Sequence, residues 1–141
     1  MLPPVLEQFI KMYETLEKGQ FGRLAEVYAL DIHFQDPLHQ IHGLTALQRY
    51  FEQLYTHLDY CQFKVTHVCP QDNQAFITWD MTFVHPRLNS GKAVVVQGAS
   101  HLKFTDKITF HRDYTDLGQM LYEHIPLLGA VIKTIKRRAI A

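Results

Sequence analysis

The chain has 141 residues, of which 47% are apolar, and its 14 Lys and Arg residues balance 14 Asp and Glu. This length and composition predict one globular domain rather than a disordered segment, and no apolar run is long enough to span a membrane. The lack of surplus positive charge argues against nucleic acid as the main partner. The first residues have no basic region and reach Glu7 early, so we expect no secretory signal and a cytoplasmic location.

The two cysteines, Cys61 and Cys69, do not form a CxxC motif. Without an export signal we expect both to be free thiols on or near a strand. The sequence holds no Walker loop, GxGxxG or GxSxG motif. This argues against a nucleotide-dependent enzyme or a serine hydrolase, and no cofactor is predicted.

The N-terminal quarter has helical patterning. Pro3 and Pro4 suit the first turn of a helix, and Gly19 is a typical C-terminal stop. A second, shorter helix is predicted over residues 21–29. The apolar positions of the first helix recur at helical spacing: Val5, Leu6, Phe9, Ile10, Tyr13 and Leu16.

A turn and a third helix follow. Residues 32–35 suit a short extended segment, which ends at Asp36-Pro37 because proline disfavours the helical conformation of the residue before it. The third helix is expected after Gly43. Its predicted buried stripe is Leu44, Leu47, Tyr50, Phe51, Leu54, Tyr55 and Leu58.

The second half of the chain changes to strand patterning. Alternation begins in residues 63–68, where Phe63, Val65 and His67 share one face, and continues over residues 76–84, 93–104 and 107–114. The connections between these segments are short. The sequence therefore predicts four consecutive antiparallel strands.

The two faces of residues 76–84 differ sharply. One face carries Ile77, Trp79, Met81 and Phe83, and the other carries Thr78, Asp80 and Thr82. The apolar face must meet helices or another subunit. The polar face is either solvated or part of a pocket wall.

Two stretches resemble known proteins. Residues 26–43 (EVYALDIHFQDPLHQIHG) are similar to the segment of ketosteroid isomerases that holds the catalytic aspartate before a proline. Residues 96–117 (VQGASHLKFTDKITFHRDYTDL) are similar to the Arg-Asp-Tyr-Phe-Asp-Leu strand of limonene epoxide hydrolases. With the order of elements, the chain resembles the nuclear transport factor 2-like superfamily, in its SnoaL-like branch, over about residues 5–120.

The resemblance implies an α+β fold, the cystatin-like roll, in one domain over residues 1–141. A curved antiparallel sheet would wrap around N-terminal helices and form a conical pocket, with an extra helix at the C-terminus. The resemblance also implies a small apolar ligand in the pocket. A homodimer through the convex sheet face would then bury Trp79 and Met81.

Asp36 falls at the position of the isomerase base, which moves a proton next to a carbonyl. The alternative is an aspartate that holds the Asp-Pro turn by accepting backbone N–H bonds. The resemblance places Met12 and Ser100 at the two positions that donate hydrogen bonds to the ligand oxygen. Met12 cannot donate, so Tyr13 or His111 would have to take over that role.

Asp113 falls at the position of an epoxide hydrolase carboxylate that activates water. In the alternative role, Asp113 pairs with Arg112 or with a helix N-terminus. By the same resemblance, Asp80 replaces the bridging arginine and Thr82 replaces the second aspartate. His111 and Asp113 are two residues apart, so they share one strand face. The expected inward cluster is Asp36, Asp80, Ser100, His111 and Asp113.

A metal site from Asp36, His39 and His42 is an alternative to surface histidines, and no metal is predicted. Helical patterning returns in residues 117–124 and 127–140. From residue 126 onward there are four basic and no acidic residues. We expect this last helix to pack on its own domain, over the pocket mouth; an interfacial membrane helix is the alternative. Its apolar stripe is Leu128, Val131, Ile132, Ile135 and Ala139.

Two functions stay open from the sequence. One is an isomerase, cyclase or hydrolase of an apolar carbonyl- or epoxide-type ligand. In it Asp36 is the general base, and His111, Ser100 and Asp113 polarise the ligand or hold water. The other is a non-catalytic ligand-binding or protein-association domain, which a pocket filled by Met12, Tyr13 or the C-terminal helix would favour.

Overall fold

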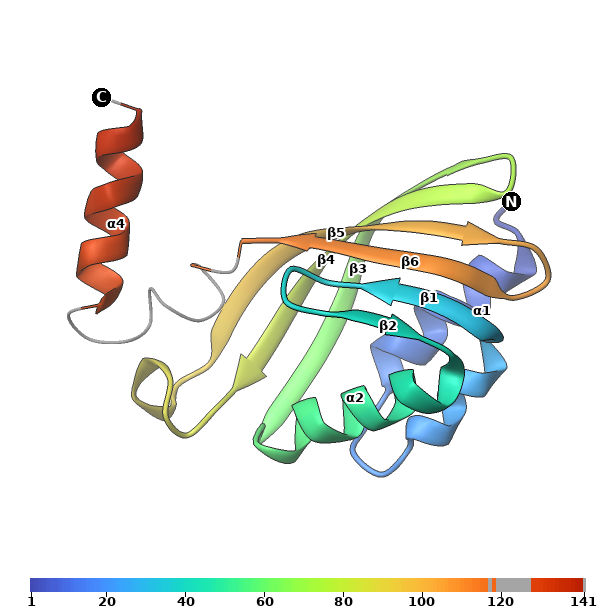
Figure 1. Ribbon diagram of the computed structural model, residues 1–141, viewed down its shortest axis with the longest axis horizontal. Helices are drawn as coiled ribbons and strands as arrows, with labels where there is room; N and C mark the ends of the chain where they lie inside the picture. The colour runs from blue at the N-terminus through green and yellow to red at the C-terminus, as the bar shows by residue number, and fades with distance from the viewer. Residues whose placement is uncertain (117, 119–127, 141) are drawn as a thin grey trace.

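The computed structural model describes residues 1–116, 118 and 128–140 (Figure 1). The helical elements are α1 (Pro4–Thr15), η1 (Phe21–Glu26), α2 (Leu44–Thr56), η2 (Asn89–Gly91) and α4 (Leu128–Ala139). The strands are β1 (Tyr28–Gln35), β2 (Gln40–His42), β3 (Tyr60–Gln71), β4 (Gln74–Val84), β5 (Val94–Phe104) and β6 (Ile108–Thr115).

The six strands form one sheet in the order β2-β1-β6-β5-β4-β3. Every neighbouring pair is antiparallel except β1 and β6, which run parallel. Figure 1 shows the sheet strongly curved, with α1 and α2 on one face. The α+β class and the antiparallel meander of β3 to β6 are therefore confirmed.

The core lies between the helices and this inner face of the sheet. From α1, Leu6, Phe9 and Met12 are buried, and from α2, Leu47 and Phe51. Spacings of three and four residues place these side chains on one side of each helix. Full burial of such a side chain contributes about 1.5–3 kcal/mol, so these two stripes hold the helices against the sheet.

The predicted helix over residues 21–29 is wrong in its second half. η1 ends at Glu26 and β1 begins at Tyr28. The reason is long-range pairing: Val27 accepts a hydrogen bond from the Ile108 amide at 2.8 Å, next to the Tyr28–Ile108 pair that joins β1 to β6. Local patterning carries no information about a partner strand so distant along the chain.

A β-bulge in β3 reverses the predicted alternation. The register shifts between Val65 and His67, so that Val65 pairs with Trp79 but His67 pairs with Thr78. Beyond the bulge Val68 packs against the core, whereas His67 is exposed. The expectation that His67 shares a face with Phe63 and Val65 is wrong, because one extra residue exchanges the two faces of a strand.

The predicted outward position of Trp79 and Met81 is also wrong. Trp79 is buried in the main core, and Met81 packs against that core from the same face of β4. Gly98 of β5 lies opposite Trp79, and a Cβ atom at Gly98 would fall 2.3 Å from the indole ring. The apolar face of β4 thus meets the helices, and a dimer cannot use these two side chains as its contact surface.

α4 lies beyond the end of the sheet (Figure 1). Its side chains Val131 and Ile135 are 47% and 62% exposed, so the expectation that its apolar stripe packs on the domain is wrong. An ion pair joins Lys136 Nζ to Asp116 Oδ2 at 2.5 Å. Among the described residues no helix is long and apolar enough to cross a membrane. The helix expected over 117–124 lies outside the described residues, except for residue 118.

Candidate functional site

A histidine and a carboxylate meet on the inner face of β6. His111 and Asp113 are two residues apart on the strand, so both side chains point to the same face. The distance from His111 Nε2 to Asp113 Oδ1 is 2.6 Å. The His111 side chain is 3% exposed and that of Asp113 is 22% exposed, so the pair runs from the core toward solvent.

A second donor reaches the same carboxylate from β5, and a residue of β4 holds that donor in place. Ser100 pairs with Asp113 in the β5–β6 register, and its hydroxyl donates to Asp113 Oδ1 at 2.5 Å. Trp79 Nε1 in turn donates to Ser100 Oγ at 2.8 Å. Asp113 Oδ1 is thus held by two side chains, whereas Oδ2 has no hydrogen-bond partner in the part of the chain that the structure describes.

Two buried tyrosines extend the network from the other end of His111. The Tyr28 hydroxyl lies 2.7 Å from His111 Nδ1, and the Tyr13 and Tyr28 hydroxyls are 2.5 Å apart. Burial raises the pKa of both tyrosines well above the usual value, so both stay neutral. With Tyr28 as donor to Nδ1, the proton of a neutral His111 sits on Nε2 and points to Asp113.

These six residues form what we call the buried hydrogen-bond chain. Its members, in order, are Tyr13, Tyr28, His111, Asp113, Ser100 and Trp79. Sequence reasoning missed Tyr28, since it assigned that residue to a helix. The strand alternation that buries Tyr28, Ile32 and Phe34 was the available signal.

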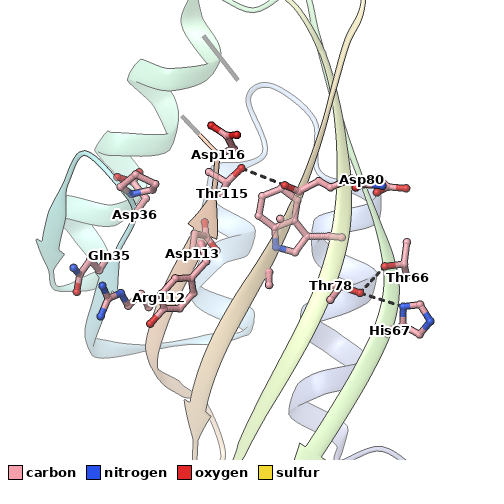
Figure 2. A pocket seen from close by; sticks show the side chains of 16 residues that line it. Gln35, Asp36, Thr66, His67, Thr78, Asp80, Arg112, Asp113, Thr115 and Asp116 are labelled. Carbon is pink, nitrogen blue, oxygen red and sulfur yellow. Dashed lines mark hydrogen bonds between the residues drawn. The ribbon is translucent and has the colours of Figure 1, made fainter. Parts of the chain in front are cut away.

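Asp113 also lines a pocket of about 970 Å³ at the end of β6 (Figure 2). Asp36, Asp80 and Asp116 line it as well, with Arg112 as a cation. The remaining lining is mostly neutral and polar: Gln35, Pro37, Thr66, His67, Thr78, Trp79, Gln97, Gly98, Ala99, Tyr114 and Thr115. The pocket can therefore surround a small molecule with hydrogen-bonding groups.

Asp36 is engaged in the turn that follows β1. Its Oδ1 accepts the backbone N–H groups of Leu38 and His39 at 2.9 and 2.8 Å. Its Oδ2 accepts the hydroxyl of Tyr50. Burial, and then this bond, raise the pKa of Tyr50. Both carboxylate oxygens thus have partners, and the turn-holding role expected as the alternative is the observed one.

The five residues expected to cluster are brought together only in part. Ser100 and His111 are each hydrogen-bonded to Asp113. Asp36 lines the same pocket, but its carboxylate is bonded to the turn and to Tyr50 instead. Asp80 lies on the outer face of β4, between the inward-facing Trp79 and Met81, and lines the pocket without joining the chain.

The two α1 residues expected to bind ligand lie in the core. Met12 is 1% exposed and Tyr13 is 7% exposed, and neither lines this pocket. Tyr13 instead ends the buried hydrogen-bond chain.

The histidines expected as alternative metal ligands have other neighbours. His42 Nδ1 lies 3.2 Å from His33 Nδ1 on the outer face, and His39 lies 3.5 Å from Asp36. Within residues 1–116, 118 and 128–140, no group of three or more His, Cys, Asp or Glu side chains is arranged to hold a metal ion.

Comparison with known proteins defines the class. The chain resembles an NTF2-like protein of unknown function from Burkholderia pseudomallei K96243, with 11% identity and a TM-score of 0.76 over 89% of this chain and 99% of that one. A protein with a ketosteroid isomerase-like fold from Catenulispora acidiphila DSM 44928, in complex with trimethylamine, is 14% identical with a TM-score of 0.76, over 89% and 96% of the two chains. At these identities the likeness shows the fold alone.

The family follows from the sequence itself. The model of the SnoaL-like domain matches residues 9–111, so the chain belongs to the SnoaL-like domain family. A candidate SnoaL-like polyketide cyclase from Jannaschia sp. CCS1 is 13% identical, with a TM-score of 0.75 over 90% of this chain and 97% of that one. No curated protein matches the chain.

Proposed function

We propose that this SnoaL-like domain binds a small carbonyl compound and moves a proton on it, with Asp113 as the acid–base group. The observation that carries the proposal is the buried hydrogen-bond chain, which includes a carboxylate in the pocket wall. A buried polar network needs every member satisfied to be tolerated, and here two hydrogen bonds, from Ser100 and His111, orient one carboxylate.

The geometry favours Asp113 over Asp36 as the base. Asp36 has both oxygens occupied by the turn and by Tyr50. Asp113 has Oδ1 fixed by Ser100 and His111, which leaves Oδ2 for a ligand. A carboxylate held in one orientation is suited to proton transfer, because it needs no rearrangement during the reaction.

The reaction consists of two proton transfers without a co-reactant. Asp113 Oδ2 takes a proton from the carbon next to the carbonyl, and the electron pair of that C–H bond enters the enolate. The protonated carboxyl group then returns the proton, either to another carbon of the enolate or, where the enolate carbon has attacked a second carbonyl group of the ligand, to the alkoxide oxygen formed there. Throughout these steps His111 Nε2 holds Asp113 Oδ1, while Tyr28 holds the Nδ1 side of the ring.

Ligand binding without catalysis is the second candidate, and one observation favours it. Met12 and Tyr13 are buried inside the cone that relatives of this fold are expected to leave hollow. In that case the pocket next to Asp113 binds its ligand through hydrogen bonds only. The homodimer stays a proposal under either function, with the outer sheet face as its surface, where Phe76, Val95 and Tyr114 are each about half exposed.

Mass spectrometry of small molecules that co-purify with the protein would identify the ligand class. The identified carbonyl compound would then be incubated with the protein in D₂O, and deuterium uptake next to the carbonyl would be followed. We expect Asp113→Asn to retain binding and to slow uptake by roughly 100-fold or more. Asp80→Asn, in the same pocket but outside the chain, is the matched control and should leave the rate unchanged.

Equal uptake by the Asp113→Asn variant and the unaltered protein would remove Asp113 from the chemistry. Binding without any uptake by the unaltered protein would favour the non-catalytic candidate.

A further inference from the structure

All charged side chains of the C-terminal helix α4 are positive. Its ionisable side chains are Lys133, Lys136, Arg137 and Arg138, and it carries no acidic residue. Val131, Ile132 and Ile135 recur at spacings of one, three and four, so they form one apolar stripe. An aliphatic stripe with Lys and Arg on the remaining surface is typical of helices that lie in a membrane interface.

Two of the three side chains of this apolar stripe are exposed to solvent. Val131 is 47% exposed, Ile135 is 62% exposed, and Ile140, just past the helix, is 89% exposed. Asp116, just after β6, contacts the helix through an ion pair with Lys136. Since this bond uses the polar side of α4, it leaves the exposed apolar residues available to a partner.

We infer that α4 binds the surface of a bilayer that contains anionic phospholipids, with its apolar stripe in the headgroup region. The charge decides the occupant: besides Lys136, which is paired with Asp116, the helix carries Lys133, Arg137 and Arg138, and these cations complement anionic headgroups and each adds to the attraction. The stripe consists of only three aliphatic side chains, whereas a standard protein interface takes roughly 20–30 residues on each side.

Membrane binding would bring the pocket close to lipid. Asp116, which anchors α4 through Lys136, also lines the pocket next to Asp113. An apolar ligand dissolved in the bilayer would then be concentrated beside the pocket. This inference goes beyond the proposed function and stands without it, because it concerns only the helix and its surface.

The test is co-sedimentation of the full chain with vesicles. One set contains phosphatidylcholine alone, and the other contains roughly one third phosphatidylglycerol. We expect binding to the anionic vesicles only, which weakens with added salt. Replacing Arg137 and Arg138 by Gln should weaken binding by roughly fivefold per charge, and Ile135→Ser should weaken it as well.

The matched controls lie on exposed positions of the domain. Lys18→Gln removes a cation elsewhere, and Leu30→Ser removes an apolar side chain that is 83% exposed. Both should bind like the unaltered protein. Absence of binding to anionic vesicles, or binding that Ile135→Ser and the Gln variants leave unchanged, would overturn the inference. A dimer that the α4 variants dissociate, without vesicle binding, would also overturn it and assign the helix to a second copy.

Discussion

Histidines on the two faces of the sheet differ in their burial and in their hydrogen-bond partners. On the inner face His111 is 2% exposed, and both of its nitrogens lie within hydrogen-bond distance of fixed partners. On the outer face His101 stacks on Phe76 at 4.3 Å between ring centres, with rings 8° from parallel, and its Nε2 lies 2.9 Å from Gln74 Oε1. Lys103 lies over the Phe110 ring nearby.

The difference shows what burial adds. An exposed ring that loses its neighbour can bond to water, whereas a buried one leaves a donor or acceptor unsatisfied. Residues of the inner face should therefore depend on one another, and those of the outer face should act almost independently. Variants of residues on each face of the sheet test that contrast.

The largest effect is expected from His111→Ala. The change removes the partner of both Tyr28 and Asp113 and leaves a cavity, so we expect a loss of about 3 kcal/mol in the free energy of unfolding. His101→Ala, the matched change on the outer face, should cost less than about 1 kcal/mol. Urea denaturation of both variants measures the difference, and equal losses would refute the contrast between the faces.

The next largest loss of stability is expected from Gly98→Ala. Its Cβ would overlap the Trp79 ring, so the indole must move away from Ser100 at a cost of about 1–3 kcal/mol. Trp79 is the single tryptophan of the chain, so its fluorescence reports the displacement directly. Gly22→Ala is the control, because a Cβ there meets nothing within 4 Å. Unchanged fluorescence and stability for Gly98→Ala would mean that the ring is not confined.

Tyr28→Phe should cost about 1–2 kcal/mol, since it removes the hydroxyl that meets both Tyr13 and His111. The specific readout is the tautomer of His111, followed by nitrogen NMR. The unaltered protein should carry its proton on Nε2, and the variant should show a mixture of tautomers. Tyr60→Phe, at an exposed tyrosine, should change neither quantity.

The smallest effect concerns the two thiols of β3. Cys61 packs against the core, whereas Cys69 is exposed, and the bulge between them accounts for their opposite faces. Burial raises the pKa of Cys61 to about 11. Because the thiolate is the reactive form, labelling at pH 8 should modify Cys69 first.

The labelling rate of Cys61 should also increase with pH. A raised pKa means that the folded protein holds the Cys61 proton more tightly, so its labelling should accelerate as the pH rises toward 11. Cys69→Ser should leave only this slow, pH-dependent site. Fast labelling of that variant at pH 8 would contradict the buried position of Cys61.

Part of the site could be predicted from alternation alone. The shared face of His111 and Asp113 follows from a period of two, which is a local property of any strand. The family resemblance gave the position of Ser100, the α+β class and a curved sheet with N-terminal helices. The role of Asp36 could not be predicted in this way. A general base and an aspartate that holds a turn differ only in the groups that bond to the carboxylate oxygens.

The amino-acid sequence alone determined most of the helices and strands and, within each regular strand, which side chains share a face. Only the tertiary structure decided which face of β4 turns inward, where the bulge of β3 exchanges faces, and that Tyr28 lies in a strand beside His111. The physical reason is the same in each case. Periodicity is encoded by neighbours along the chain, whereas pairing and burial depend on partners that folding brings together from far along it.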